Sequence, residues 1–479
     1  MENNIKILDF SNRQNRDIRL EDISEEYLNY IKKTTKEDPW YPSYHIAPHC
    51  GLLNDPNGLC QIDGVHHIFY QWYPIGPVHG LKYWYHLSTV DFINYEDHGV
   101  EISPVDSFDE AGCYTGMTLL DEGVGRVYYT GIKGSNKQPS ICYATLDGNH
   151  ISNKKMLIDY DPTLTTLNFR DPCVFKKNNH YIMLVGGEGL DNKGIFPVYV
   201  SENPYDFLYK GNLKLAEYDY GYMLECPNYY ESEGKGILFF SPQGIQSPNK
   251  YDFRNVFSVL YSIGEPINEE TLEFNAPTFY EMDKGFDFYA PQVFQDEKGR
   301  YILYGWLGNS KCEYPSDKNN WAHMLTIPRC LTIEEDLLIQ EPLEELKQLR
   351  QEGIKVDDVY SITDSSFEFC FEANQTFEVK IQNDEAEGIV FASNGDEYTL
   401  DRSKMTYLYN ESYGNIRYAK RLMNTKHEIR VFVDRSSIEI FCDQGKTVFT
   451  GRFYIDNISI MKISGIEGTL YQLKSNNYK

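Results

Sequence analysis

The chain has 479 residues, of which 41% are hydrophobic and 24% are charged, a composition typical of folded proteins rather than disordered ones. Acidic residues outnumber basic ones by 71 to 45, and the resulting net charge of −26 argues against binding to nucleic acid or to an anionic membrane surface. At roughly 150 residues per domain, the length predicts about three domains, or one large unit with an accessory.

No stretch of the sequence approaches the ~20 apolar residues that a membrane span needs. The first residues, Met-Glu-Asn-Asn-Ile-Lys, lack the basic start and the apolar run of a secretion signal. The ten cysteines are scattered singly, without the Cys-x-x-Cys spacing of a zinc site or a dense disulfide framework. We therefore expect a cytoplasmic protein with free thiols and with no membrane partner, no nucleic-acid partner, no metal and no cofactor.

Residues 1–36 predict a helical extension, with a helix over 17–33 in which apolar residues such as Tyr27 and Ile31 recur at helical spacing. From 37 to 332 the chain changes to short apolar and aromatic runs separated by Gly, Asn and Asp, which is typical of strands. The 39 tyrosines and the aromatic content of 15% suit strands, and they suit a sugar-binding surface equally well.

The strand-rich region repeats along the chain. Five segments share one order of landmark, strand, polar turn and strand, and their landmarks are Asp55, Cys113, Asp171, Glu225 and Asp287. Successive landmarks lie 58, 58, 54 and 62 residues apart. A nearly constant period among strands predicts a five-bladed β-propeller over 37–332, with one blade per repeat. The weaker alternative is an irregular sandwich in which hairpins of similar length recur by chance.

The last third of the chain predicts a different unit. Residues 333–352 carry leucines interspersed with charges, which indicates a helical linker. Alternating strands such as SFEFCFEA and HEIRVFVD then follow over 353–479 and predict a separate β-sandwich. The predicted fold class is therefore all-β, a five-bladed propeller followed by a C-terminal β-sandwich.

Three carboxylates stand at corresponding places in the repeat. Asp55, Asp171 and Glu225 each precede the first strand of a hairpin, and equivalent positions of different blades lie around one end of a propeller channel. We therefore expect them to converge on one pocket, where repulsion raises at least one pKa. Two neighbouring carboxyl groups, one ionised and one protonated, are what glycoside hydrolysis uses. Taken singly, the segment around Asp55 is as readily a turn. The segment around Asp171 is as readily an ordinary ion pair, and Glu225 a blade-edge carboxylate.

Seven segments resemble glycoside hydrolase family 32, the invertases and β-fructofuranosidases, over nearly the whole chain. In chain order they are HIAPHCGLLNDPNG at 45–58, FYQWYPIGPVHG at 69–80, NFRDP at 168–172, LECPN at 224–228, DFYAPQVF at 287–294, WAHMLTIPR at 321–329 and VDRSSIEIF at 433–441. The fold of that family, a five-bladed propeller with a C-terminal β-sandwich, agrees with the architecture predicted from the repeat.

The resemblance implies a retaining hydrolase of β-fructofuranosides. Asp55 would be the nucleophile, Glu225 the general acid/base and Asp171 a transition-state stabiliser, with the two catalytic carboxyl groups roughly 5 Å apart and no metal. The further residues implied to bind substrate are Leu52, Leu53, Asn54, Gln71, His79, Tyr114, Thr115, Arg170 and Trp306. Two positions depart from the family pattern: Tyr114-Thr115 replaces a Phe-Ser pair, and His79 stands where many invertases place a Trp.

Two phrases, YQWYPIGPVHGLKYWYH and EYPSDKNNWAH, resemble the bacterial branch of the family that acts on sucrose 6-phosphate. A phosphate on the glucosyl side would need cationic or hydroxyl donors, for which Lys82, Lys311 and Tyr314 are candidates beside His79. A general β-fructosidase without phosphate preference and a non-catalytic sugar-binding propeller remain as alternatives. The sequence leaves open whether the chain is a monomer or a homodimer. It also leaves open whether 433–441 supports the propeller, mediates dimerisation or does neither.

Overall fold

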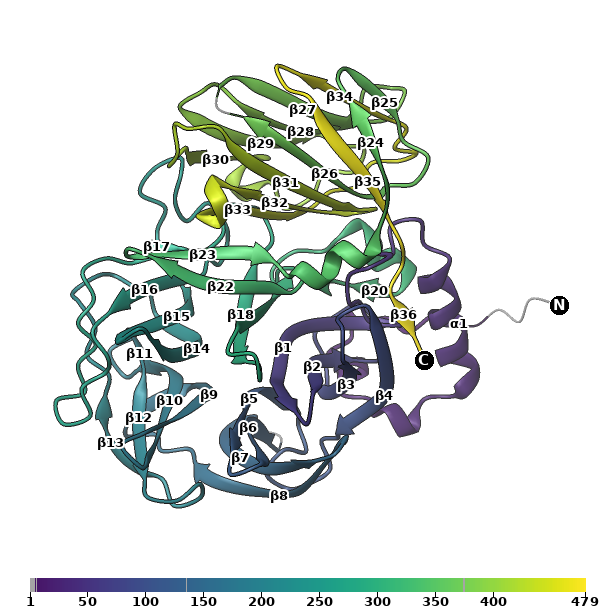
Figure 1. Ribbon diagram of the computed structural model, residues 1–479. Coiled ribbons are helices and arrows are strands. Elements are labelled where there is room, and N and C mark those ends of the chain that lie inside the picture. Colours follow the sequence, from purple (N-terminus) through teal and green to yellow (C-terminus); the bar gives the residue numbers. More distant parts are fainter. Residues whose placement is uncertain (1–4, 6, 135, 374) are drawn as a thin grey trace.

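The computed structural model describes residues 5, 7–134, 136–373 and 375–479. Nearly all of the regular structure is β, and it forms a propeller and a sandwich that lie against each other (Figure 1). The all-β fold class, a propeller followed by a sandwich, is therefore confirmed. No helix in the described part of the chain is long and apolar enough to cross a membrane.

The propeller consists of antiparallel units of four strands. The first two are β1 (Gly51–Ile62), β2 (Val65–Tyr73), β3 (Tyr83–Thr89) and β4 (Asn94–Ile102), and β5 (Cys113–Asp121), β6 (Val124–Lys133), β7 (Gln138–Asp147) and β8 (His150–Asp159). The next two are β9 (Thr165–Lys177), β10 (His180–Gly189), β12 (Pro197–Ser201) and β13 (Leu208–Asn212), and β14 (Met223–Ser232), β15 (Lys235–Gln243), β16 (Leu260–Gly264) and β17 (Tyr280–Glu281). The last is β18 (Tyr289–Gln295), β19 (Tyr301–Leu307), β22 (Arg329–Glu334) and β23 (Leu337–Pro342). Short strands add to these units: β11 (Gly194–Ile195), β20 (Trp321–Ala322), β21 (Met324–Leu325) and β36 (Asn477–Tyr478).

Strand pairing within the described ranges groups these units into four sheets rather than five. Gly187 of β10 pairs with Leu224 of β14, and this single pair joins the third and fourth units into one nine-stranded sheet. The number of five separate blades therefore stays a prediction.

The first strand of each unit is interrupted by a β-bulge. The pairing register shifts between Leu53 and Pro56, Cys113 and Gly116, Arg170 and Cys173, Glu225 and Asn228, and Tyr289 and Gln292. A bulge bends its strand and re-aims the side chains at that point. Asp55, Asp171 and Glu225 lie at these bulges, inside β1, β9 and β14. The expectation that they precede the strands is wrong, because a bulge breaks the alternation by which a strand is recognised.

The N-terminal extension is helical, but its α-helix starts later than predicted. It contains the 3₁₀ turns η1 (Arg13–Arg16) and η2 (Leu20–Asp22) and then α1 (Glu25–Lys36), rather than one helix over 17–33. Ser24 sets the start of α1, because its hydroxyl accepts a hydrogen bond from the Tyr27 N–H at 3.2 Å. Residues 1–4 and 6 of the predicted extension lie outside the described residues.

The helical linker predicted over 333–352 is wrong for most of its length. β22 and β23 form a hairpin at the edge of the last propeller unit, and only η4 (Glu344–Leu349) is helical, as a 3₁₀ turn. Pro342 prevents a helix from running through the segment, and the apolar residues on its two sides are buried separately in strand and turn.

The C-terminal sandwich contains, within the described residues, two six-stranded sheets in the orders β24-β35-β26-β31-β32-β33 and β25-β34-β27-β28-β29-β30. Their strands are β24 (Arg350–Val356), β25 (Val359–Ser361), β26 (Ser366–Ala373), β27 (Phe377–Gln382), β28 (Gly388–Ser393), β29 (Glu397–Lys404), β30 (Ile416–Lys420), β31 (His427–Asp434), β32 (Ser437–Cys442), β33 (Thr447–Arg452), β34 (Ile460–Ser464) and β35 (Gly468–Leu473). The remaining 3₁₀ turns are η3 (Pro315–Asn319), η5 (Glu411–Tyr413) and η6 (Asp443–Gly445). Alternate residues such as Phe377 and Val379 are buried, as expected for strands with one face on a core.

Buried charges of segment 433–441 fasten the sandwich to the propeller. The Asp434 carboxylate accepts hydrogen bonds from the backbone N–H groups of 43–45 and from His45 Nδ1 at 2.8 Å. Glu439 accepts one from His45 Nε2 at 3.0 Å. Burial opposes a charge on the ring, but these two carboxylates raise the pKa of His45 to about 9. Of the roles left open for this segment, the contacts support the propeller interface.

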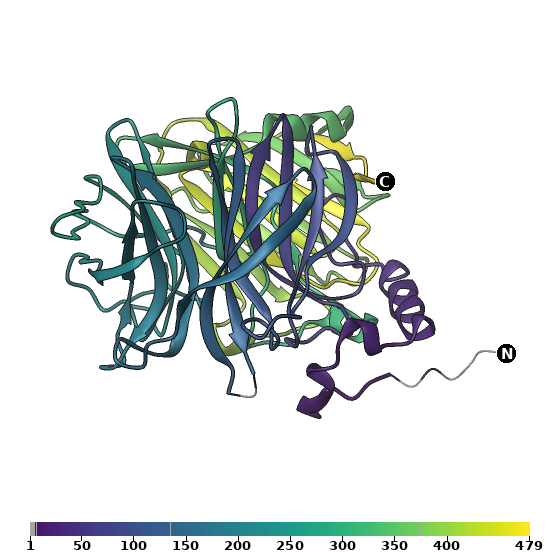
Figure 2. The same ribbon diagram turned by 90° about the horizontal axis from the view of Figure 1, so that it is seen from below.

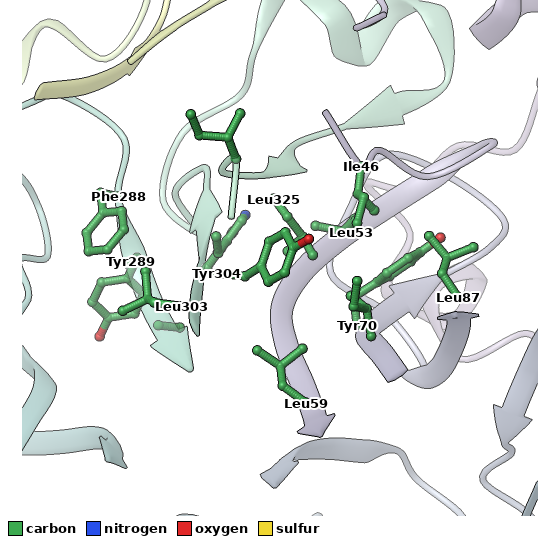
Figure 3. Packing of buried hydrophobic residues seen from close by; sticks show 14 of the residues in the cluster. Ile46, Leu53, Leu59, Tyr70, Leu87, Phe288, Tyr289, Leu303, Tyr304 and Leu325 are labelled. Carbon is green, nitrogen blue, oxygen red and sulfur yellow. The ribbon is translucent and has the colours of Figure 1, made fainter. Parts of the chain in front are cut away.

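Apolar packing holds the first and last propeller units together. Figure 3 shows buried residues between β1 and β19, among them Leu53, Leu59, Leu303 and Leu325. Tyr289 of β18 belongs to the same cluster. A close-packed core of this kind gives the strands that carry the pocket residues little freedom to move.

Candidate active site

A pocket of about 680 Å³ opens at the end of the propeller where the bulges lie. Most of the predicted site residues line it, and they come from several sheets. They are Asn54, Asp55, Gln71, His79, Lys82, Tyr114, Thr115, Arg170, Asp171, Glu225 and Trp306.

Cys226 is the common neighbour of the three carboxylates. Its Sγ lies 3.8 Å from Asp55 Oδ2 and 3.5 Å from Asp171 Oδ2, and it directly follows Glu225 in β14. Three carboxylates from three propeller units therefore converge at one point, as the repeat predicts.

Asp55 is buried on the pocket floor and held by three donors. Asn54 Nδ2 donates to Oδ1 at 3.1 Å, while Gln71 Nε2 at 3.1 Å and the Thr115 hydroxyl donate to Oδ2. Burial raises the pKa of Asp55, and the hydrogen bonds from Thr115 and Asn54 oppose that rise. The donors also fix the orientation of the carboxylate, which an attacking group needs.

Asp171 occupies a left-handed backbone conformation with φ of 64°, which aspartate adopts more readily than most residues because its short polar side chain can hydrogen-bond locally. Its N–H donates to the Thr130 hydroxyl at 2.8 Å, and its Oδ2 accepts the Cys226 N–H at 3.1 Å. Burial raises the pKa of Asp171 to about 7; Arg170 opposes this rise and the neighbouring carboxylates add to it. The rise agrees in direction with the expectation for at least one carboxyl group, but burial rather than repulsion between the carboxylates is its main cause.

Glu225 is surrounded by donors on both oxygens. Arg170 donates from Nε at 2.9 Å and from Nη2 at 2.5 Å to Oε1. Gln243 Nε2 and the Tyr289 hydroxyl each donate to Oε2 at 2.5 Å. These contacts orient the carboxyl group toward the pocket and hold it near Asp55 and Asp171.

Gln243 and Tyr289 also line the pocket and were missed by sequence reasoning. Tyr289 stands in the matched segment DFYAPQVF, so a signal for it was present. Gln243 lies on β15 opposite Met223, two residues from Glu225. Its place follows only from the hairpin register, which no local pattern reveals.

Lys82 and His79 line the pocket beside the floor. Lys82 Nζ donates to Asn54 Oδ1 at 2.6 Å, which turns the Asn54 amide nitrogen toward Asp55. Burial lowers the pKa of Lys82 to about 7, and the charge of Asp55 opposes that shift. Burial and the nearby Lys82 charge lower the pKa of His79 well below its usual value, so its ring is neutral at pH 7.

Four predicted contact residues do not line the pocket. Leu52 and Leu53 are buried in the propeller core, because the bulge that re-aims the β1 side chains begins after Leu53. Tyr314 is buried and donates its hydroxyl to Asp287 Oδ1 at 2.6 Å, and Lys311 is exposed to solvent. The predicted contact set is therefore wrong for Leu52, Leu53 and Tyr314, whereas Lys311, whose neighbour Ser310 lines the pocket, stays a prediction.

Three cations that the sequence did not single out do line the pocket: Arg13 and Arg16 of η1, and Lys137 just before β7. The pocket therefore combines an acidic floor with a basic rim. Among the residues that the structure describes, no group of three or more His, Cys, Asp or Glu is placed to hold a metal ion.

Buried carboxylates held together at one end of a β-propeller are the groups that a glycoside hydrolase needs. The family model for the glycosyl hydrolases family 32 N-terminal domain matches residues 45–342, and that for the family 32 C-terminal domain matches 343–473. The chain belongs to glycosyl hydrolase family 32.

Individual relatives cover almost the whole chain. The sucrose-6-phosphate hydrolase of Vibrio alginolyticus is 42% identical over 95% of both chains. The solved sucrose-6-phosphate hydrolase of Lactobacillus gasseri superimposes with a TM-score of 0.91 at 30% identity, covering 97% of this chain and 99% of that one. A Bombyx mori family 32 β-fructofuranosidase solved with sucrose gives a TM-score of 0.83 at 26% identity, covering 95% and 98%.

Proposed function

We propose that this enzyme hydrolyses the β-fructofuranosyl bond of sucrose 6-phosphate, and less efficiently that of sucrose. The products are fructose with glucose 6-phosphate or glucose. The observation that carries the proposal is the convergence of Asp55, Asp171 and Glu225 around Cys226 in a pocket with a basic rim. Relatives named for this reaction, similar over nearly their full length, support the choice of substrate.

The reaction runs in two steps with retention at C2. Asp55 attacks C2 of the fructosyl unit while Glu225 gives its proton to the glycosidic oxygen, so the C2–O bond breaks and the glucosyl unit leaves. Glu225 then removes a proton from water, which attacks C2 and releases fructose and the Asp55 carboxylate. Asp171 holds fructosyl hydroxyls, and Arg170 orients Glu225 through two N–H groups.

The phosphate is on the leaving glucosyl unit, so it is expected toward the pocket mouth rather than on the acidic floor. A phosphorylated sugar is retained inside cells by its charge, and we therefore assign the enzyme to the cytoplasm. The substrate is a small molecule, and the proposed chemistry needs neither cofactor nor metal.

The test compares kcat/KM for sucrose 6-phosphate with kcat/KM for sucrose, measured by release of glucose 6-phosphate or glucose. A preference of about tenfold or more, worth ~1.4 kcal/mol, supports phosphate recognition. Equal values would indicate a general β-fructosidase, and cleavage of neither would overturn the enzymatic assignment. The Asp55→Ala protein, purified in the same way, controls for contaminating invertase.

A further inference from the structure

We propose that the N-terminal extension builds the phosphate site of this enzyme. The guanidinium groups of Arg13 and Arg16 bind the phosphate of the leaving glucosyl unit at the pocket mouth, and Lys137, whose charge Asp17 offsets, adds a further hydrogen-bond donor. This inference rests on the proposed function, because it names the groups that recognise the phosphorylated half of that substrate.

These three cations line the same pocket as Asp55 and Glu225. Arg13 and Arg16 precede residue 45, where the family match begins, so they are additions to the matched catalytic unit. A chain with a net charge of −26 repels a sugar phosphate unless positive charge is concentrated where the phosphate binds.

The two arginines carry charge that nearby carboxylates do not neutralise. Asp17 also lines the mouth, but its Oδ1 lies 3.5 Å from Lys137 Nζ and offsets that charge. Over the described ranges, no carboxylate lies within ion-pair distance of Arg13 or Arg16. The mouth therefore keeps two positive charges, which match the charge of a phosphate dianion.

Hydrogen bonds hold the extension against the loop that carries His79 and Lys82. The Arg16 carbonyl oxygen accepts a hydrogen bond from the Leu81 N–H at 2.8 Å, and the Tyr73 hydroxyl donates to the Asn15 carbonyl oxygen at 2.8 Å. The extension lies along the edge of the propeller in Figure 2. Its arginines are therefore held at the pocket by the folded chain, which lowers the entropic cost of binding an anion.

Two glycines make this close approach possible. A Cβ atom on Gly80 would lie 2.6 Å from the Arg16 carbonyl oxygen, and one on Gly76 would lie 2.2 Å from the Phe10 ring. A larger residue at Gly80 would push the backbone of the extension away from the pocket, and one at Gly76 would displace the Phe10 ring.

The side chains suit a phosphate. Arg16 Nε donates to the Phe10 carbonyl at 2.8 Å, which orients the guanidinium, and none of the described residues accepts a hydrogen bond from its two terminal nitrogens. The Arg13 side chain is exposed and makes no hydrogen bond to the described residues, so an entering anion can reach it. Planar guanidinium forks bind phosphate oxygens in pairs, and charge-assisted bonds of this kind are the strong ones.

The test uses the full-length enzyme and the double substitution Arg13→Gln and Arg16→Gln, which removes both charges but keeps amide donors. The measured quantity is the ratio of kcat/KM for sucrose 6-phosphate to kcat/KM for sucrose. We expect this ratio to fall by about tenfold or more, since two charge-assisted hydrogen bonds are lost. The matched control is Lys32→Gln with Lys36→Gln, which removes two charges from α1 away from the pocket lining and should keep the ratio within twofold.

A second readout uses inhibition of sucrose hydrolysis by glucose 6-phosphate and by glucose. In the wild type we expect glucose 6-phosphate to be the stronger inhibitor, and in the double variant we expect this advantage to be lost. The single variant Arg13→Gln repeats both measurements at an exposed side chain that forms no hydrogen bond or ion pair with the described residues, so its folding is not at risk.

The outcomes separate this inference from the proposed function. A wild type without preference for the phosphorylated substrate and without stronger inhibition by glucose 6-phosphate would overturn phosphate recognition itself. A wild type with that preference and an unchanged ratio in both arginine variants would leave the proposed function standing and overturn the assignment to the extension.

Discussion

Replacement of Tyr289 by phenylalanine removes one donor from the acid/base end of the pocket. The Tyr289 hydroxyl donates to Glu225 Oε2 at 2.5 Å, and the ring is buried between Phe257 and Trp306, with centroid distances of 5.3 and 6.1 Å. Phenylalanine keeps that packing, so the substitution removes only the hydroxyl, which also lies 3.2 Å from the Ser241 carbonyl oxygen.

The expected loss in kcat/KM follows from the charge of Glu225, the hydrogen-bond partner of Tyr289. A hydrogen bond to a charged group contributes about 1.5–3 kcal/mol, and Glu225 is charged once it has given its proton to the leaving oxygen. The bond therefore stabilises the transition state of that proton transfer more than the ground state. Because Arg170 and Gln243 still hold the carboxylate, we expect kcat/KM for sucrose to fall by about 10- to 100-fold.

The assay compares sucrose with an aryl β-fructofuranoside whose phenolate leaves without much protonation. If Tyr289 acts through the acid role of Glu225, the loss with the aryl substrate should be clearly smaller. Tyr304→Phe is the matched control, because Tyr304 is a buried tyrosine of the neighbouring strand β19 that does not line the pocket. A sucrose kcat/KM within twofold of the wild type, or equal losses on both substrates in a protein of normal Tm, would refute this reasoning.

Three further substitutions test the carboxylates. Asp55→Ala should remove sucrose hydrolysis by orders of magnitude in a protein with unchanged circular dichroism, and near-normal turnover would exclude Asp55 as nucleophile. Glu225→Gln should lose about 10²–10⁴-fold in activity towards sucrose, and azide should restore turnover of the aryl fructoside with β-fructosyl azide as product; an α-product would contradict the assigned roles. Asp171→Asn tests the pKa of about 7 against the ordinary 3.8: the wild-type fold loses stability as the pH rises through this range, because the carboxyl ionises in the unfolded chain while the buried one stays protonated. Urea unfolding should therefore show that the free energy of unfolding of Asp171→Asn rises by roughly 1–3 kcal/mol relative to that of the wild type between pH 5 and pH 8. A difference in the free energy of unfolding that stays constant over this range would contradict the raised pKa.

The sequence was sufficient to predict that a propeller precedes a sandwich and to identify the three carboxylates. A propeller repeats one unit around an axis, so a constant spacing along the chain becomes a common place around the pocket. For that reason Asp55, Asp171 and Glu225 could be grouped before any geometry was known. The alternation in segments such as 377–382 likewise identified the sandwich strands, since one face of each is buried.

Local patterns were misleading where backbone geometry departs from a regular strand or helix. Leu52 and Leu53 stand beside the catalytic motif in sequence, yet the bulge that starts after them leaves both in the core. The segment 333–352 was predicted to be one helical linker, yet Leu338 is buried in β23 and Leu346 in η4, on either side of Pro342. In β1 the extra residue of the bulge changed the direction of the side chains that follow, and after β23 the missing N–H of Pro342 did the same.

The partners of the carboxylates were decided by tertiary structure alone. Gln243 reaches Glu225 through the register of a hairpin, and Tyr289 reaches it from a different propeller unit. Arg13 and Arg16 reach the pocket because the extension packs on two glycines of a distant loop. Such contacts join residues with no fixed separation along the chain, so periodicity cannot predict them. The sequence by itself determined which chemistry the pocket contains, and the packing of distant segments determined which groups orient the carboxylates and which charges surround the entrance.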